Sequence, residues 1–135
     1  MKIYEHRVSY DEIDGQKIAF NAHYLKWVDR AVYEFYRSGG YPPLLLERLG
    51  FDIVVRKATV DYLQPAHFDE VISFYLSIQH LGNSSINSLI SIENERHELV
   101  ATVEIVHVNV IEGLKHPIPY SIRTYLQKIM NVNKK

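Results

Sequence analysis

Three carboxylates lie within four residues, just before the segment with the clearest helical pattern. They are Asp11, Glu12 and Asp14, in the stretch DEIDGQKIAFNAHYLKW that ends at Trp27. A carboxylate on a loop beside a helix can act as a general base on water, or it can attack an electrophilic carbon itself. Acids also occur there because they complement the helix dipole and cap the first turn. We assign this structural role to Asp11 and Glu12, as solvated charges at a strand end, and keep Asp14 as the candidate for chemistry.

The start of the predicted helix offers a second chemical element. Free backbone N–H groups at a helix N-terminus form a site for negative charge, and here they belong to Asn21, Ala22 and His23. The side chains of Asn21 and His23 can assist such a site or act as ordinary caps. Tyr24, one of ten tyrosines, can line a pocket or belong to the core or a subunit interface.

Other kinds of catalytic site find no support in the sequence. The seven histidines form neither a His-x-x-x-His pair nor a His-Glu-x-x-His motif, so we expect no metal site. Ser84-Ser85 lacks the Gly-x-Ser-x-Gly pattern of a serine hydrolase. Cysteine is absent, which excludes thiol nucleophiles and disulfides. Gly39-Gly40 follows the helix and indicates its end, not a phosphate-binding loop.

Charge and hydropathy restrict the partners. The net charge is −1, from 15 basic and 16 acidic residues, so we expect neither nucleic acid nor a membrane as the main partner. No apolar run has the length of a membrane span, and the first ten residues, MKIYEHRVSY, alternate in polarity unlike a signal peptide. We therefore expect a cytoplasmic protein.

The spacing of apolar residues predicts the elements that position these groups. We expect strands and helices in the following order: a strand over Ile3–Tyr10, a long helix over Ala22–Ser38 with Asn21 as its N-cap, a short helix over Leu44–Leu49 closed by Gly50, strands over Phe51–Tyr62, Val71–Leu81, Ser84–Ile92 and Leu99–Val110, and a terminal helix containing Ile122 and Ile129. Residues 131–135 are expected to fray.

One architecture fits this order. Four long strands joined by short turns predict an antiparallel sheet, and one very apolar helix must be buried by it. We expect an α+β fold, a single domain over residues 1–135, in which a curved sheet wraps around the long central helix and a C-terminal helix follows. The unpaired outer strands favour a homodimer with a continuous sheet, or a homotetramer.

The order of elements resembles the hotdog fold, and two stretches resemble the acyl-CoA thioesterases of the 4-hydroxybenzoyl-CoA thioesterase-like family. The first is Tyr10-Asp11-Glu12-Ile13-Asp14 followed by the helix start Asn21-Ala22-His23-Tyr24. The second is Val60-Asp61-Tyr62-Leu63-Gln64-Pro65-Ala66 followed by Asp69. The element order covers nearly the whole chain, whereas the specific motifs cover the first quarter and the stretch around Pro65.

The resemblance implies a reaction and roles for particular residues. It implies hydrolysis of an acyl-CoA to a free acid and CoA, with Asp14 at the position of the catalytic carboxylate as general base or nucleophile. A backbone amide near Asn21 would hold the thioester oxygen. CoA would be part of the substrate, with no separate cofactor. Its phosphates would meet Arg56, Lys57 and His67, or these residues would simply cover a solvated strand face.

One departure from the family pattern concerns Lys17, since the family usually has glycine at that position. A lysine there alters the loop and could pair with Asp14, lowering its basicity. Lys17 therefore favours an alternative function, a module that binds acyl-CoA or acyl-carrier-protein thioesters without cleaving them. A hydratase or dehydratase of the same fold ranks last, because that chemistry usually needs an Asp-His pair across the site, and His23 would lie on the helix that follows Asp14.

Overall fold

A computed structural model describes residues 1–133 of the chain. The elements follow one another as β1 (Lys2–Arg7), a short 3-10 turn η1 (Tyr10–Glu12), α1 (His23–Ser38), α2 (Pro43–Leu49), β2 (Ile53–Tyr62), β3 (Val71–Leu81), β4 (Ser85–Glu93), β5 (Leu99–Ile111), β6 (Leu114–Lys115) and α3 (Tyr120–Asn133).

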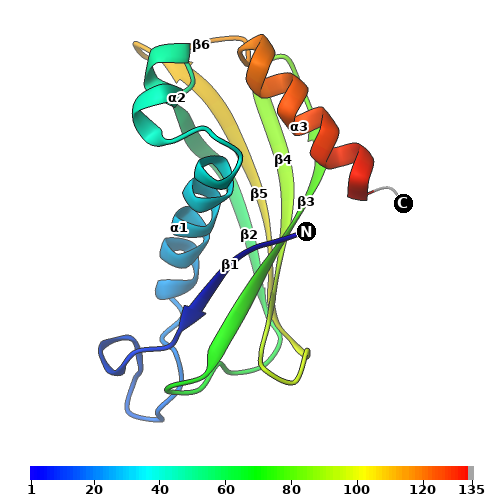
Figure 1. The fold of residues 1–135 in the computed structure, drawn as a ribbon. Helices are drawn as coiled ribbons and strands as arrows, with labels where there is room; N and C mark the ends of the chain where they lie inside the picture. The colour runs from blue at the N-terminus through cyan, green and yellow to red at the C-terminus, as the bar shows by residue number, and fades with distance from the viewer. Residues whose placement is uncertain (134–135) are drawn as a thin grey trace.

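A single curved sheet forms the body of the molecule. Its strand order is β1-β3-β4-β5-β2, with β6 paired to β5 alone, and its five long strands pair antiparallel throughout. The sheet bends around α1, which lies along its concave side, while α3 lies across one end (Figure 1). The expected α+β architecture, with a curved sheet around a long central helix, is confirmed.

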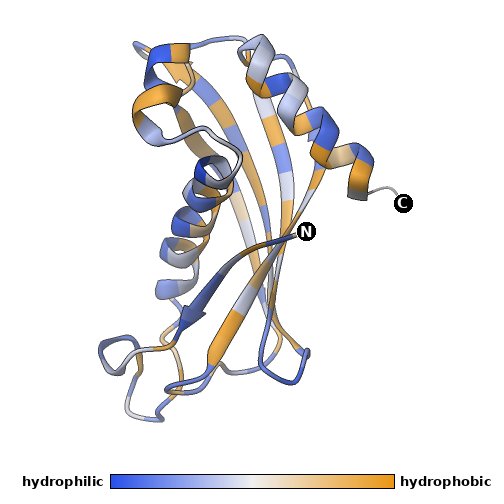
Figure 2. Cartoon of the chain, in the orientation of Figure 1, coloured by the Kyte–Doolittle hydropathy of each residue, from blue (hydrophilic) through white to orange (hydrophobic). Residues whose placement is uncertain are grey.

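The core lies between α1 and the concave face of the sheet. Strand β4 alternates between buried and less buried residues throughout, and β3 does so from Val71 to Ile78. This is the pattern of a sheet with one covered face, and the alternation is visible as bands of colour in Figure 2. The helix contributes its apolar stripe of Tyr24, Trp27, Val28, Ala31, Val32, Phe35 and Tyr36. Leu25, on the same helix, lies outside this stripe and is exposed.

Several predicted boundaries change in the structure. Strand β1 ends at Arg7 and not at Tyr10, because the chain turns into η1. Helix α1 begins at His23 with Ala22 as its cap residue, and no side chain caps it, so the predicted N-cap role of Asn21 is wrong. Helix α3 runs to Asn133 where fraying was expected. The same expectation for residues 134–135 lies outside the described residues.

Strand β2 stands apart because it is exposed on both faces. It forms one edge of the sheet, and eight of its ten residues are exposed along the pattern ieeeeeeiee. Large apolar side chains are among them, with Val54 47%, Val55 49% and Tyr62 53% exposed. A long edge strand with apolar side chains is suited to pairing with another chain. Within residues 1–133, no helix has the length and apolar character needed to cross a bilayer.

Candidate active site

The segment between η1 and α1 folds back on itself as a small hairpin, which we call hairpin 12–20. The Phe20 N–H donates to the Glu12 carbonyl at 2.9 Å, Ile13 and Ala19 form a bridge, and the Asp14 N–H donates to the Ile18 carbonyl at 3.0 Å. The Lys17 N–H closes the turn on the Asp14 carbonyl at 3.0 Å. Asp14 therefore lies at the tip of a hydrogen-bonded hairpin, in a defined position.

Lys17 occupies the left-handed position of this turn. Its φ is 61°, the conformation that completes a tight hairpin of this length and that normally favours glycine. The glycine expected there in the resembling family would thus serve the turn, whereas Gly15 has no positive φ. Among residues 1–133 no carboxylate forms an ion pair with Lys17. The pairing with Asp14 that the sequence allowed is therefore not formed.

Asp14 is partly buried and lies on a cleft. Its Oδ1 accepts a hydrogen bond from the Gln16 N–H at 2.8 Å, which fixes the carboxylate and leaves Oδ2 free of hydrogen bonds within the described part of the chain. The cleft has a volume of about 530 Å³. It is lined by Asp14, Ile18, Ala19, Phe20, Asn21, Tyr24, Tyr62, Leu63, Gln64 and Pro65.

The start of α1 lies beside the same cleft, which Asn21 lines. The His23 N–H donates to the Phe20 carbonyl at 3.1 Å and the Tyr24 N–H to the Asn21 carbonyl at 3.4 Å. The N–H groups of Asn21 and Ala22 have no acceptor within residues 1–133. The first turn of α1 also contains no acidic residue. Its positive dipole end is therefore available to an incoming negative charge.

Two tyrosines fix this helix start against the end of β2. The rings of Tyr24 and Tyr62 meet edge to face at 5.1 Å, and the Tyr62 hydroxyl donates to the Asn21 carbonyl at 3.2 Å. Burial raises the pKa of Tyr24, against the lowering effect of a hydrogen bond with the Ala66 backbone. The Tyr24 hydroxyl thus stays neutral near pH 7, and its role here is to shape the cleft.

Glu12 corrects the sequence-based expectation of a solvated charge. The residue is 7% exposed, and its carboxylate accepts three hydrogen bonds: from Trp27 Nε1 at 2.6 Å, from His6 Nε2 at 2.7 Å and from the Ser9 N–H at 2.8 Å. Burial opposes ionisation, but the bonds from Ser9, His6 and Trp27 outweigh it and lower the pKa of Glu12 to about 2. Glu12 is therefore a buried carboxylate, while Asp11 is exposed as expected.

The structure brings three of the predicted site residues together and separates others. Asp14, Asn21 and Tyr24 line the cleft. His23 instead stacks on Trp27, with ring centroids 6.1 Å apart. Arg56 and Lys57 lie exposed in the middle of β2, and Lys57 borders a shallow depression on the outer face of the sheet.

The sequence reasoning missed seven lining residues: Ile18, Ala19, Phe20, Tyr62, Leu63, Gln64 and Pro65. The last four belong to the second motif, which was noted for its resemblance and not as part of a site. Among residues 1–133, no three His, Asp or Glu side chains are grouped so as to hold a metal. The expectation that neither a metal nor a separate cofactor is required stays a prediction.

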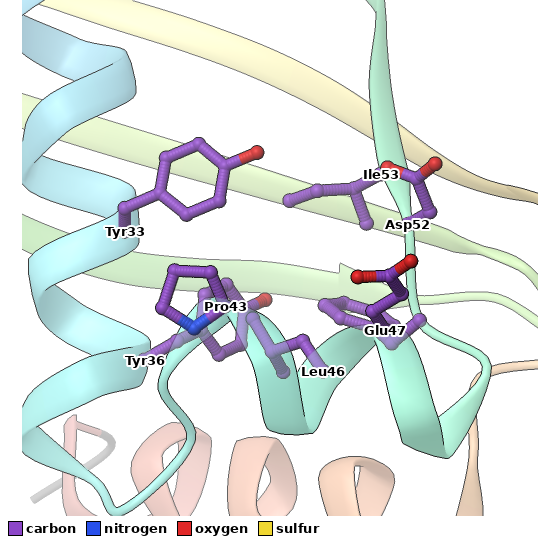
Figure 3. Close-up of a pocket in the computed structure, with 8 residues that line it drawn as sticks. Tyr33, Tyr36, Pro43, Leu46, Glu47, Asp52 and Ile53 are labelled. Carbon is purple, nitrogen blue, oxygen red and sulfur yellow. The ribbon is translucent and has the colours of Figure 1, made fainter.

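A second, smaller cavity lies at the opposite end of β2. It has a volume of about 240 Å³ and is enclosed by α1, α2 and the start of β2 (Figure 3). Its lining residues are Tyr33, Tyr36, Pro43, Leu46, Glu47, Phe51, Asp52 and Ile53. Each end of the exposed edge strand therefore carries a cavity.

Comparison with known proteins gives consistent matches. The model of a family described as "Thioesterase superfamily" matches residues 16–101. The Acyl-CoA thioester hydrolase YbgC of Escherichia coli is 30% identical over 120 residues, covering 86% of this chain and 88% of that protein. The crystal structure of a hypothetical protein from Aquifex aeolicus superposes with a TM-score of 0.85 at 27% identity, covering 91% of this chain and 97% of that one. A Staphylococcus aureus protein in complex with CoA has a TM-score of 0.88 at 18% identity, with 97% and 85% covered, which shows the fold.

Proposed function

Since the chain belongs to the thioesterase superfamily and is an acyl-CoA thioesterase with the hotdog fold, we propose that it hydrolyses its substrate with the carboxylate of Asp14. The products would be a free acid and CoA. The observation that supports this assignment is the arrangement of the cleft, where Asp14 and Asn21, at the start of α1, line one space.

The chemistry follows from these two groups. The free Oδ2 of Asp14 either takes a proton from a water that attacks the thioester carbonyl, or attacks that carbonyl itself to form an anhydride that water then opens. In both routes the carbonyl oxygen gains negative charge in the tetrahedral intermediate. The unpaired N–H groups of Asn21 and Ala22 are the donors that would stabilise it. Collapse of the intermediate expels the CoA thiolate, which takes up a proton.

The substrate class rests on the relatives and on the charges of the chain. The Escherichia coli relative is named an acyl-CoA thioester hydrolase, and the Staphylococcus aureus protein of the same fold was solved with CoA. For the CoA phosphates we propose Arg56 and Lys57 on β2, with Lys17 in the turn of hairpin 12–20. CoA then enters as part of the substrate, and no separate cofactor is required. We place the reaction in the cytoplasm, which suits a chain without cysteine.

A dimer completes the proposed site. If two β2 edges pair antiparallel about a twofold axis, the Ile53 end of one strand lies against the Tyr62 end of the other. The cavity beside α2 of one protomer would then adjoin the Asp14 cleft of its partner, and the acyl group would occupy the joined space at the interface. Two such dimers would form the homotetramer that the sequence also allowed.

The test is thiol release from a panel of acyl-CoAs by the wild type, Asp14→Asn and Asp11→Asn. We expect Asp14→Asn to lower kcat by at least about a hundredfold, the range for a lost general base or nucleophile. Asp11→Asn is the matched control, because Asp11 is an exposed acid three residues away that bonds Ser9 alone, and it should keep full activity. Equal rates for wild type and Asp14→Asn would refute the role of Asp14.

The same experiment separates the alternative of a binding module. Saturable acyl-CoA binding without thiol release from any of the panel would select it. The feature that favoured this alternative is Lys17 in place of the family glycine, and within the described residues this lysine forms no ion pair with Asp14. The hydratase alternative needs a histidine opposite Asp14, whereas the His23 ring packs between Phe20 and Trp27.

A further inference from the structure

Glu12 is a buried charge that the proposed reaction does not use. It lies two residues before Asp14, on the strand of hairpin 12–20 that leads to the catalytic turn. A buried carboxylate is unfavourable unless its oxygen atoms accept hydrogen bonds. In Glu12 both oxygens do so, Oε1 from His6 and Ser9 and Oε2 from Trp27.

The partners of Glu12 come from three separate parts of the fold. His6 belongs to β1, Ser9 to the turn after it, and Trp27 to the second turn of α1. The Glu12 main chain adds a fourth link, because its carbonyl accepts a hydrogen bond from the N–H of Phe20, the last residue of the hairpin's second strand. One residue therefore ties the base of the hairpin to the edge of the sheet and to the central helix.

Trp27 makes this tie rigid. Its side chain is fully buried, and its indole ring packs against His6 at 4.9 Å and against Tyr24 at 5.1 Å between centroids. A ring held on several sides has one orientation, so its N–H points to one place. The fixed Trp27 N–H holds the Glu12 carboxylate in one position. Asp14 follows two residues later in the hydrogen-bonded hairpin, so its position depends on that of Glu12.

From these contacts we propose that Glu12 is a positioning residue, which holds hairpin 12–20 against α1 so that Asp14 faces the free N–H groups at the helix start. The inference rests on the proposed function for its catalytic consequence. Its structural part, the attachment of the hairpin to Trp27, is independent of which reaction the cleft performs. Displacement of a catalytic group by about 1 Å can lower the rate a hundredfold. The attachment of the hairpin through Glu12 therefore controls kcat, although Glu12 does not touch the substrate.

The test replaces Glu12 by the isosteric amide. In Glu12→Gln the amide NH₂ faces a donor wherever it points, either the Trp27 Nε1–H or the Ser9 N–H, so one bond must break. We expect kcat to fall about tenfold to a hundredfold with KM changed by less than about threefold, because Glu12 makes no contact with substrate. Trp27→Phe removes the opposing donor, and the double variant should be no worse than Glu12→Gln alone.

A matched control separates positioning from stability. Asn94 is another buried polar residue, 3% exposed, whose side chain holds the β4–β5 turn through the N–H groups of Arg96 and Glu98. Asn94→Ala should destabilise the fold and leave kcat unchanged. If Glu12→Gln keeps the wild-type kcat, or if Asn94→Ala lowers kcat equally, Glu12 has no positioning role in catalysis.

Hydrogen exchange supplies a readout that does not need activity. We expect the Asp14 and Lys17 amides, which close the hairpin, to exchange at least about tenfold faster in Glu12→Gln than in Asn94→Ala at matched global stability. If the wild type cleaves no acyl-CoA, the proposed function fails and this arm alone decides the role of Glu12. Faster exchange would then support the proposal that Glu12 holds hairpin 12–20 against α1, and unchanged exchange would overturn it.

Discussion

At the scale of single residues, two acids that are almost adjacent in sequence have opposite environments. Glu12 is surrounded by hydrogen-bond donors and closed off from water. Asp14 lines a cleft, and its Oδ1 alone accepts a hydrogen bond within the described residues, from the Gln16 N–H. Two neighbouring carboxylates can take different roles according to what surrounds each. The residue type alone carries none of that information.

The low pKa of Glu12 predicts a loss of stability in acid. A group whose pKa is depressed in the folded state stabilises the fold above its unfolded pKa, and this contribution disappears as the pH falls through the folded pKa. For Glu12 the window runs from 4.5 down to about 2, and the contribution is on the order of 3 kcal/mol. Urea unfolding between pH 7 and pH 2 should show this steep decline in the wild type. Glu12→Gln should be less stable at pH 7 and should decline less over the same window, and an equally steep decline would contradict the assignment.

At the scale of elements, hairpin 12–20 shows how a turn can accept an unusual residue. Lys17 adopts the left-handed conformation with a φ of 61°, which costs a residue with a Cβ about 1 kcal/mol. The hydrogen bonds on both sides of the turn, from Lys17 to Asp14 and from Asp14 to Ile18, offset this cost. The hairpin therefore keeps its form without glycine at that position.

Replacing this lysine by glycine should be tolerated or favourable. We expect Lys17→Gly to raise the free energy of unfolding by up to about 1 kcal/mol, because relief of strain exceeds the added freedom of the unfolded chain. Lys17→Val should lower it by about 1 to 2 kcal/mol, since a β-branched residue resists positive φ. Gly15→Ala is the control, because an added Cβ there has no neighbour within 4 Å. Denaturant unfolding measures all three, and destabilisation by Lys17→Gly would show that the lysine side chain itself supports the turn.

The elements also show where sequence reasoning succeeds and where it stops. Strands β3, β4 and β5 were predicted within one or two residues, because their β-rich runs are bounded by local turn signals. The burial of Glu12 was missed, because its partners lie six residues before and fifteen residues after it and meet it only in the folded chain. The same reason hides Tyr62 from the site, since β2 reaches Asn21 across 41 residues.

At the scale of the whole molecule, the exposed edge of β2 carries backbone N–H groups that point away from the sheet, and their role in dimer formation can be tested. The Leu63 N–H donates to the Val100 carbonyl on β5, and N–H groups alternate sides along a strand. The N–H groups of Ala58, Val60 and Tyr62 therefore point away from β5, toward the partner strand of the proposed dimer. Proline at such a position removes an outward donor and leaves the bonds to β5 in place.

We therefore predict that Ala58→Pro converts the dimer into a folded monomer. The matched control is Glu5→Pro on β1, the other edge strand, where the Val8 N–H bonds the Glu70 carbonyl and the alternation places the Glu5 N–H outward. Sedimentation or light scattering should give the mass of two chains for the wild type and Glu5→Pro, and of one chain for Ala58→Pro. Because the acyl pocket is proposed to span the interface, thiol release should fall with the loss of the dimer. A fully active Ala58→Pro monomer would show that the Asp14 cleft is complete within one chain.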